Sequence, residues 1–78
     1  MISEIDRVRW HCRRGLLELD LILARFMDRH YEGLDGEARA LFQELLQQPD
    51  NDLLDWALGR SAPAGTRYQR IVELLRAS

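Results

Sequence analysis

Apolar residues recur at helical spacing along almost the whole chain, and glycine or proline interrupts the pattern before any helix becomes long. No stretch shows the strict alternation of apolar and polar residues, or the β-branched enrichment, of a strand. Because the chain has only 78 residues, its helices can bury their apolar faces only against one another. We therefore predict an all-α fold, a compact five-helix bundle, in a single domain over residues 1–78.

Capping residues and glycines delimit the first three predicted helices. Ser3 is a good N-cap for the first helix, and Gly15 ends that helix or turns the chain. The second and longest helix is predicted over 16–31, and Asp35 is expected to cap a third helix over 37–48. The residues predicted to face the core are Ile5, Val8 and Cys12, then Leu16, Leu19, Leu23, Phe26, Met27 and His30, then Ala38, Leu41, Phe42 and Leu45.

Proline and glycine also delimit two further predicted helices. Pro49 ends the third helix, and Asp50 is expected to cap a fourth helix that continues to Leu58, where Gly59 follows as a natural C-terminal stop. The fifth helix is predicted to start at Thr66, because Gln69 completes a capping box with it. The inward residues of the fifth helix are predicted to be Tyr68, Ile71, Val72 and Leu75.

The content of cysteine and of long apolar runs excludes several classes of protein. A single cysteine allows no internal disulfide and is too little for a structural zinc site. No apolar run approaches the roughly 18–20 residues of a membrane span, and the first residues lack the basic and then apolar layout of a signal peptide. We therefore expect no membrane insertion and a protein of a reducing compartment.

Basic residues, all of them arginine, are concentrated towards the two ends of a chain whose net charge is −2. Residues 1–14 hold four arginines and two acids, whereas residues 15–59 hold three arginines and ten acids. Binding to nucleic-acid backbones requires a basic field over a whole face. Because no predicted helix carries an array of Arg, Asn or Gln that could read bases, we expect no nucleic-acid partner.

Nucleophiles and metal ligands are too few and too scattered to form a catalytic centre. Cys12 lies on the inner stripe of the first helix, where an inert buried thiol is expected. Its neighbour His11 points in a different direction, which argues against joint metal binding, and His30 is expected to be a packed or capping residue. We therefore expect no enzyme activity, no metal site and no stably bound cofactor.

The surface around residues 10–18 is the most distinctive part of the sequence. On a helical wheel Trp10 falls well away from the apolar stripe, and Glu18 and Ile22 project outward beside Arg25 and Arg29. Exposed aromatic and aliphatic residues among arginines are typical of a protein-binding patch. The alternative is that the last helix or the N-terminus covers Trp10 and that the charges are ordinary solvated groups.

The segment 10–20, Trp-His-Cys-Arg-Arg-Gly-Leu-Leu-Glu-Leu-Asp, resembles the signature of the succinate dehydrogenase assembly factor 2 family. These proteins are flavinylation factors with an Arg-Gly-x-x-Glu motif, which is intact here as Arg14, Gly15 and Glu18. The resemblance covers roughly residues 7–59, and the match is looser beyond Gly59. Its further parts are the aromatic-rich segment 26–31, then Phe42, Leu45 and Leu46, and then Pro49-Asp50-Asn51-Asp52-Leu53-Leu54-Asp55-Trp56.

The resemblance implies a five-helix bundle and a function that the residues alone do not reveal. Family members bind the flavoprotein subunit of succinate dehydrogenase, and in bacteria also that of fumarate reductase, and they promote covalent attachment of FAD to a histidine of that subunit. Because the bond forms within the client protein, the helper supplies no catalytic residue, and FAD is handled in the client. The chain resembles the bacterial form, which implies a cytoplasmic protein, and we expect a monomer.

The resemblance also places the partner-binding surface around Arg14, Gly15 and Glu18. Gly15 would allow the backbone of the partner to approach closely or would adopt a positive φ. Arg14 can make paired hydrogen bonds to a carboxylate or to carbonyls, and Glu18, one turn along, can bind a cation. Asp20 has an alternative structural role, because it borders the inner face and could hold an arginine nearby. The further candidates for partner contact are Arg13, Trp10 and Asp20.

A regulatory binding module of another kind, such as an antitoxin-like inhibitor, is the alternative function. The same helical bundle could bind a different protein through the same surface. The two functions differ in a measurable product, because only the flavinylation factor changes the amount of covalently bound flavin in a flavoprotein subunit.

Overall fold

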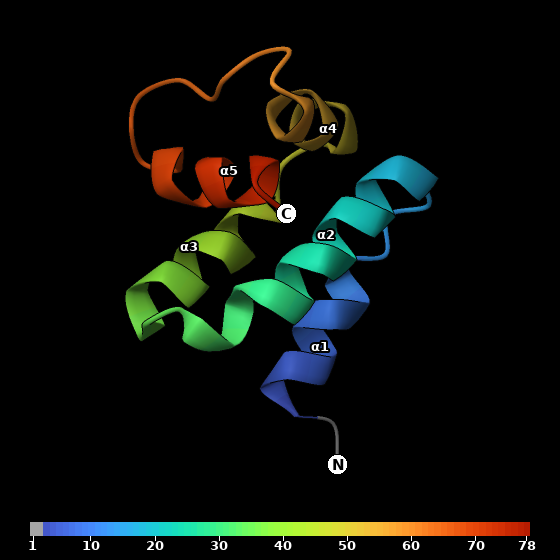
Figure 1. Cartoon of the computed structure of the whole chain (residues 1–78), viewed down its shortest axis with the longest axis vertical. Helices are drawn as coiled ribbons and strands as arrows, with labels where there is room; N and C mark the ends of the chain where they lie inside the picture. The colour runs from blue at the N-terminus through green and yellow to red at the C-terminus, as the bar shows by residue number, and fades with distance from the viewer. Residues whose placement is uncertain (1–2) are drawn as a thin grey trace.

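The computed structural model describes residues 3–78, so Met1 and Ile2 of the predicted domain lie outside the described residues. Within 3–78 there are five α-helices and no strand, which confirms the predicted all-α bundle. In Figure 1, α1 lies beside α2, while α4 and α5 pack together at the other end of the molecule. The elements are α1 Glu4–His11, α2 Leu17–Arg29, a 3₁₀ turn η1 Tyr31–Gly33, α3 Gly36–Leu45, α4 Asp50–Leu58 and α5 Gln69–Arg76.

Three of the predicted helix ends form as expected. The Ser3 hydroxyl accepts a hydrogen bond from the backbone N–H of Asp6 at 3.1 Å, and the Asp35 carboxylate accepts one from the N–H of Ala38 at 2.8 Å. Gly59 ends α4 with a φ of +77°, in the left-handed region that glycine adopts most easily. The local signals in the sequence therefore identify these three boundaries correctly.

The predicted cap of the fourth helix is wrong. Pro49 occupies the N-cap position of α4, and Asp50 is the first helical residue. The Asp50 carboxylate does not cap the α4 backbone but accepts a hydrogen bond from the side chain of Arg14. A tertiary contact has therefore replaced the local one.

The predicted start of the fifth helix is also wrong. The capping box of Thr66 and Gln69 does not form, and α5 begins at Gln69 after an N-cap at Tyr68. The preceding residues are held against α3, because Glu44 accepts hydrogen bonds from Arg67 at 2.7 Å and from the Tyr68 hydroxyl at 2.9 Å. Arg67 and Tyr68 bind α3 through their side chains, and α5 begins only after them, at Gln69.

Two predicted helices are longer than the observed ones. The second ends at Arg29 rather than at residue 31, and a 3₁₀ turn from Tyr31 follows it. The third ends at Leu45 rather than at residue 48. In both places the chain leaves the helix early and turns towards the next element.

Aromatic side chains of α2, η1 and α3 form the centre of the core. The rings of Phe26 and Phe42 stack with centroids 4.3 Å apart, and Tyr31 meets Phe42 edge-on at 5.8 Å. The Tyr31 ring is fully buried, and its hydroxyl accepts a hydrogen bond from the side-chain amide of Gln43 at 3.0 Å. Other predicted core residues are also buried, namely Val8, Cys12, Leu19, Leu23, Met27, Ala38, Leu45, Ile71, Val72 and Leu75.

Candidate functional site

The turn between α1 and α2 carries Arg14 and Gly15 of the Arg-Gly-x-x-Glu motif, Glu18 lies in the first turn of α2, and Asp20 shapes the turn. One carboxylate oxygen of Asp20 accepts a hydrogen bond from the backbone N–H of Arg14 at 2.7 Å, and the other accepts one from the N–H of Gly15 at 3.3 Å. Gly15 has a φ of +85°, a conformation that L side chains rarely adopt. Asp20 therefore has the structural role left open by the sequence, although it binds the backbone of Arg14 rather than an arginine side chain.

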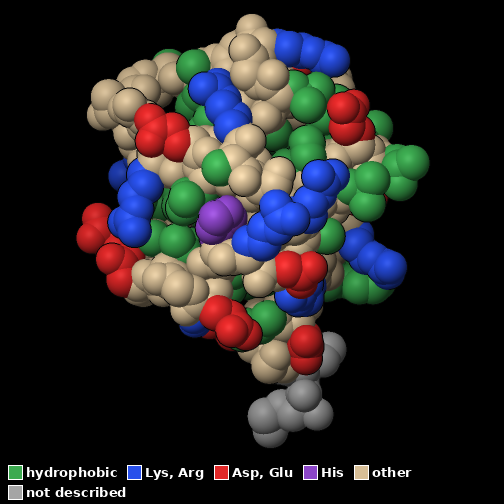
Figure 2. All heavy atoms as spheres, in the orientation of Figure 1, with side chains coloured by type: hydrophobic (Ala, Val, Ile, Leu, Met, Phe, Trp, Pro, Cys, Tyr) green, Lys and Arg blue, Asp and Glu red, His purple; other side chains and the backbone are tan. Residues whose placement is uncertain are grey.

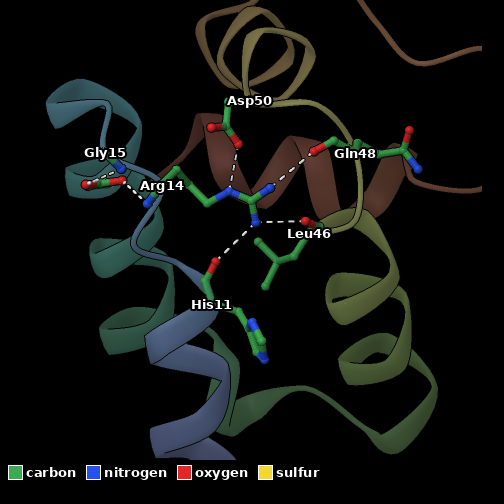
Figure 3. A network of polar contacts seen from close by, with 7 residues as sticks. His11, Arg14, Gly15, Leu46, Gln48 and Asp50 are labelled. Carbon is green, nitrogen blue, oxygen red and sulfur yellow. Dashed lines mark hydrogen bonds and ion pairs between the residues drawn. The ribbon is translucent and has the colours of Figure 1, made fainter.

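The guanidinium of Arg14 connects this turn to the joint between α3 and α4 (Figure 3). Its Nε atom donates to the Asp50 carboxylate at 2.7 Å. Its Nη1 atom donates to the carbonyl oxygens of Leu46 at 2.7 Å and of His11 at 3.1 Å, and Nη2 donates to that of Gln48 at 3.3 Å. The side chain is only 18% exposed, so these contacts are largely sheltered from water.

These hydrogen bonds satisfy carbonyl groups that the ends of helices leave without partners. Leu46 and Gln48 lie just after α3, and His11 is the last residue of α1. Arg14 thus makes hydrogen bonds to carbonyls and a carboxylate of this chain, whereas the sequence analysis expected such groups on a partner. Its side chain fixes the position of the motif turn relative to α3 and α4.

The other two motif residues, Gly15 and Glu18, are exposed to solvent. Among the described residues other than its two chain neighbours, none has an atom within 4 Å of a Cβ built on Gly15, so the space in front of this residue is open. Glu18 is exposed in the first turn of α2, and among residues 3–78 its side chain makes no hydrogen bond or ion pair. Gly15 and Glu18 are therefore both accessible to a partner.

Large apolar side chains are exposed near the motif. Trp10 is 69% exposed on α1, so neither the described N-terminal residues nor α5 covers it. Arg13, in the turn, is also exposed. Leu17 and Leu21, four residues apart on α2, are exposed as well, and the sequence analysis missed both. These residues have the composition of a protein-binding surface.

The prediction that Ile22 points outward is wrong. Ile22 is 9% exposed and belongs to the core, whereas its neighbour Leu21 is 49% exposed. The segment 16–23 contains more apolar residues than one helix face can bury, so periodicity does not identify the one left outside.

The described residues offer little reactive chemistry. Burial raises the pKa of the Cys12 thiol to about 12, so this side chain stays protonated at neutral pH. His30 follows α2 at its C-cap position and its ring packs on Phe26, which agrees with the predicted packed or capping role. Within residues 3–78, no group of three or more His, Cys, Asp or Glu side chains could hold a metal ion.

Two observations concern the surface and the helices of the described residues. In the face drawn in Figure 2, arginine and acidic side chains are mixed, and no broad basic field forms there. None of the helices in the described part of the chain is long and apolar enough to cross a membrane.

Comparisons with known proteins connect this geometry to one family. A family model described as "Flavinator of succinate dehydrogenase" matches residues 6–78. The match therefore extends beyond Gly59, where the motif resemblance is loose.

Three similar proteins bear the name "FAD assembly factor SdhE". The protein from Coxiella burnetii is 39% identical over 70 residues, which cover 90% of this chain and 85% of the relative. The protein from Pseudomonas aeruginosa is 40% identical over 94% of this chain and 87% of the relative. The protein from Shewanella oneidensis is 39% identical over 96% of this chain and 92% of the relative. Because the family model and these relatives span nearly the whole chain, the protein belongs to the family of flavinators of succinate dehydrogenase.

Proposed function

We propose that this protein binds the flavoprotein subunit of succinate dehydrogenase and promotes covalent attachment of FAD to it. Membership of the flavinator family supports this function. A fumarate reductase flavoprotein is proposed as a second client. The protein acts as a cytoplasmic monomer and binds no cofactor stably by itself, because FAD is held in the client.

The open turn at Gly15 is the observation that carries the proposed docking site. The turn is fixed from within by Asp20 and Arg14, and apart from the chain neighbours of Gly15 no described residue comes within 4 Å of a Cβ built there. Because Gly15 has no side chain, the backbone of a partner can approach it more closely than it could approach any other residue type. Glu18 lies one turn away, exposed, and supplies a carboxylate for a cation of the partner.

Docking would promote flavin attachment if the factor binds one conformation of the client better than the others. A ligand shifts a conformational equilibrium only by its differential affinity for the states. We propose that the favoured state places FAD and the acceptor histidine of the client together. The helper then needs no nucleophile, in agreement with the buried and protonated Cys12.

Deleting the gene from its host tests this function. Covalently bound flavin remains on the denatured flavoprotein subunit and is visible by its fluorescence in a gel. We expect the deletion to lower this fluorescence strongly, and the wild-type gene to restore it. Unchanged flavin in the deletion strain would contradict the proposal.

A substitution at Glu18 tests the docking site itself. Glu18→Gln keeps the shape of the side chain and removes its charge, and no contact within residues 3–78 is lost. We expect the variant to unfold at the wild-type temperature but to restore less covalent flavin. Full restoration by Glu18→Gln would remove this carboxylate from the docking site.

A further inference from the structure

A groove of about 710 Å³ lies between α1 and α3, beside the motif turn. Its walls are formed by Arg7 and His11 of α1 and by Gln43 of α3 and Gln47, which follows α3. Arg14 lines the groove where both helices end, since its guanidinium binds the carbonyl oxygen of His11 and that of a residue just after α3. The groove therefore reaches Arg14, the residue that precedes Gly15 in the motif turn.

The charged groups along this groove favour an acidic ligand. Arg7 is exposed and makes no ion pair with any residue in 3–78. Glu4 is the one acidic lining residue, and it is already paired with Arg39 at 3.4 Å. The groove therefore offers an unpaired positive charge to a ligand, although the whole chain has a net charge of −2.

The spacing of the wall residues favours an extended peptide. Arg7 and His11 are four positions apart on α1, which corresponds to about 6 Å along the helix axis. In an extended chain, residues two positions apart are separated by about 6.6–6.8 Å. Alternate groups of a peptide can therefore meet Arg7 and His11 on one wall and Gln43 and Gln47 on the other.

We propose that this groove binds an extended acidic segment of the client flavoprotein. A carboxylate of the segment pairs with Arg7, and the imidazole of His11 and the amide of Gln47 bind its other polar groups. The segment then continues past Arg14 to the turn at Gly15. This proposal rests on the proposed function, and it adds the chemistry of the partner and a second contact surface.

Two charge-changing variants test the groove against a matched control. Arg7→Glu and Gln47→Glu place a negative charge on opposite walls, and both side chains are exposed, so the fold should remain intact. Arg70→Glu makes the same charge change as Arg7→Glu, and a larger one than Gln47→Glu, on an exposed residue of α5 that does not line the groove. Circular dichroism and thermal melting verify that each variant is folded.

Affinity for the purified flavoprotein subunit without covalent flavin is then measured at low and at physiological salt. We expect both groove variants to bind about tenfold more weakly, chiefly through slower association, and the loss to be smaller at high salt. The control should bind within about twofold of the wild type. Groove variants that bind like the wild type would overturn the proposal, while wild-type binding itself would still support the proposed function.

A peptide of alternating Glu and Ser residues tests the groove without the client. In NMR titrations of the ¹⁵N-labelled protein, we expect it to shift the amide signals of Arg7, His11, Gln43 and Gln47, whereas a Lys and Ser peptide should not. Shifts elsewhere, no shifts, or equal binding of free glutarate would overturn the assignment to an acidic segment. Because this titration needs no flavoprotein, its result does not depend on whether the proposed function is correct.

Discussion

Replacing Arg14 with alanine tests whether its guanidinium holds the motif turn in place. The substitution removes four hydrogen bonds, to the carboxylate of Asp50 and to three backbone carbonyls. A buried hydrogen bond to a charged group contributes about 1.5–3 kcal/mol, but water replaces part of the loss here because Asp50 is 37% exposed. We expect the free energy of unfolding to fall by about 2–4 kcal/mol in total.

This loss is large for so small a protein. A chain of 78 residues is expected to have a stability of roughly 4–12 kcal/mol. The melting temperature should therefore fall by roughly 10–25 °C, measured by circular dichroism at 222 nm, and the urea midpoint should fall with it. Arg14→Lys should have an intermediate effect, because an ammonium group cannot reach all four acceptors.

The neighbouring Arg13 gives the matched control. Arg13 is exposed, and its side chain makes no hydrogen bond or ion pair within residues 3–78. Arg13→Ala should therefore change the free energy of unfolding by less than about 0.5 kcal/mol. The reasoning would be refuted if Arg14→Ala were as stable as Arg13→Ala, since Arg14 would then contribute nothing to the fold.

Three further predictions concern the same region. Gly15→Ala should lower the free energy of unfolding by about 1–2 kcal/mol in urea denaturation, because φ is +85° there, and an unchanged stability would contradict this turn geometry. Burial raises the pKa of Cys12 to about 12 from its ordinary 9.0, so its stabilising effect is complete below about pH 9 and is lost as the pH rises towards 12. Cys12→Ala should weaken the alkaline loss of stability without abolishing it, because the pKa values of Tyr31 and Tyr68 are also raised, and an equally steep loss in both proteins would contradict the role of the thiol. Trp10→Ala should leave the melting temperature nearly unchanged but weaken binding to the flavoprotein about tenfold, and equal binding would exclude the tryptophan from the interface.

The parts of the fold that could be predicted are those set by neighbouring residues. The caps at Ser3 and Asp35 and the stop at Gly59 depend on groups within a few positions in the chain. Tertiary contacts decide the boundaries that were predicted wrongly. At α4 the carboxylate of Asp50 binds Arg14, and before α5 a glutamate of α3 binds Arg67.

The role of Arg14 could not be deduced from periodicity or spacing. Its acceptors beyond His11 lie 32 to 36 positions away, and three of the four are backbone carbonyls, which any residue type would provide. Of the four acceptors, only the carboxylate of Asp50 can be recognised in the sequence. The sequence analysis assigned that carboxylate to the cap of the fourth helix. A motif shared with a family shows that Arg14 matters but not whether it contacts the partner or the fold.

The structure divides the motif into two kinds of residue. Arg14 acts inward and fixes the turn, whereas Gly15 and Glu18 face the solvent. Loss of function on replacing Arg14 would therefore follow from a displaced turn alone and would not identify a contact with the client. Glu18 has no hydrogen bond or ion pair to lose within residues 3–78, so among the three motif residues it is the one for which lost flavin attachment with unchanged stability indicates direct binding.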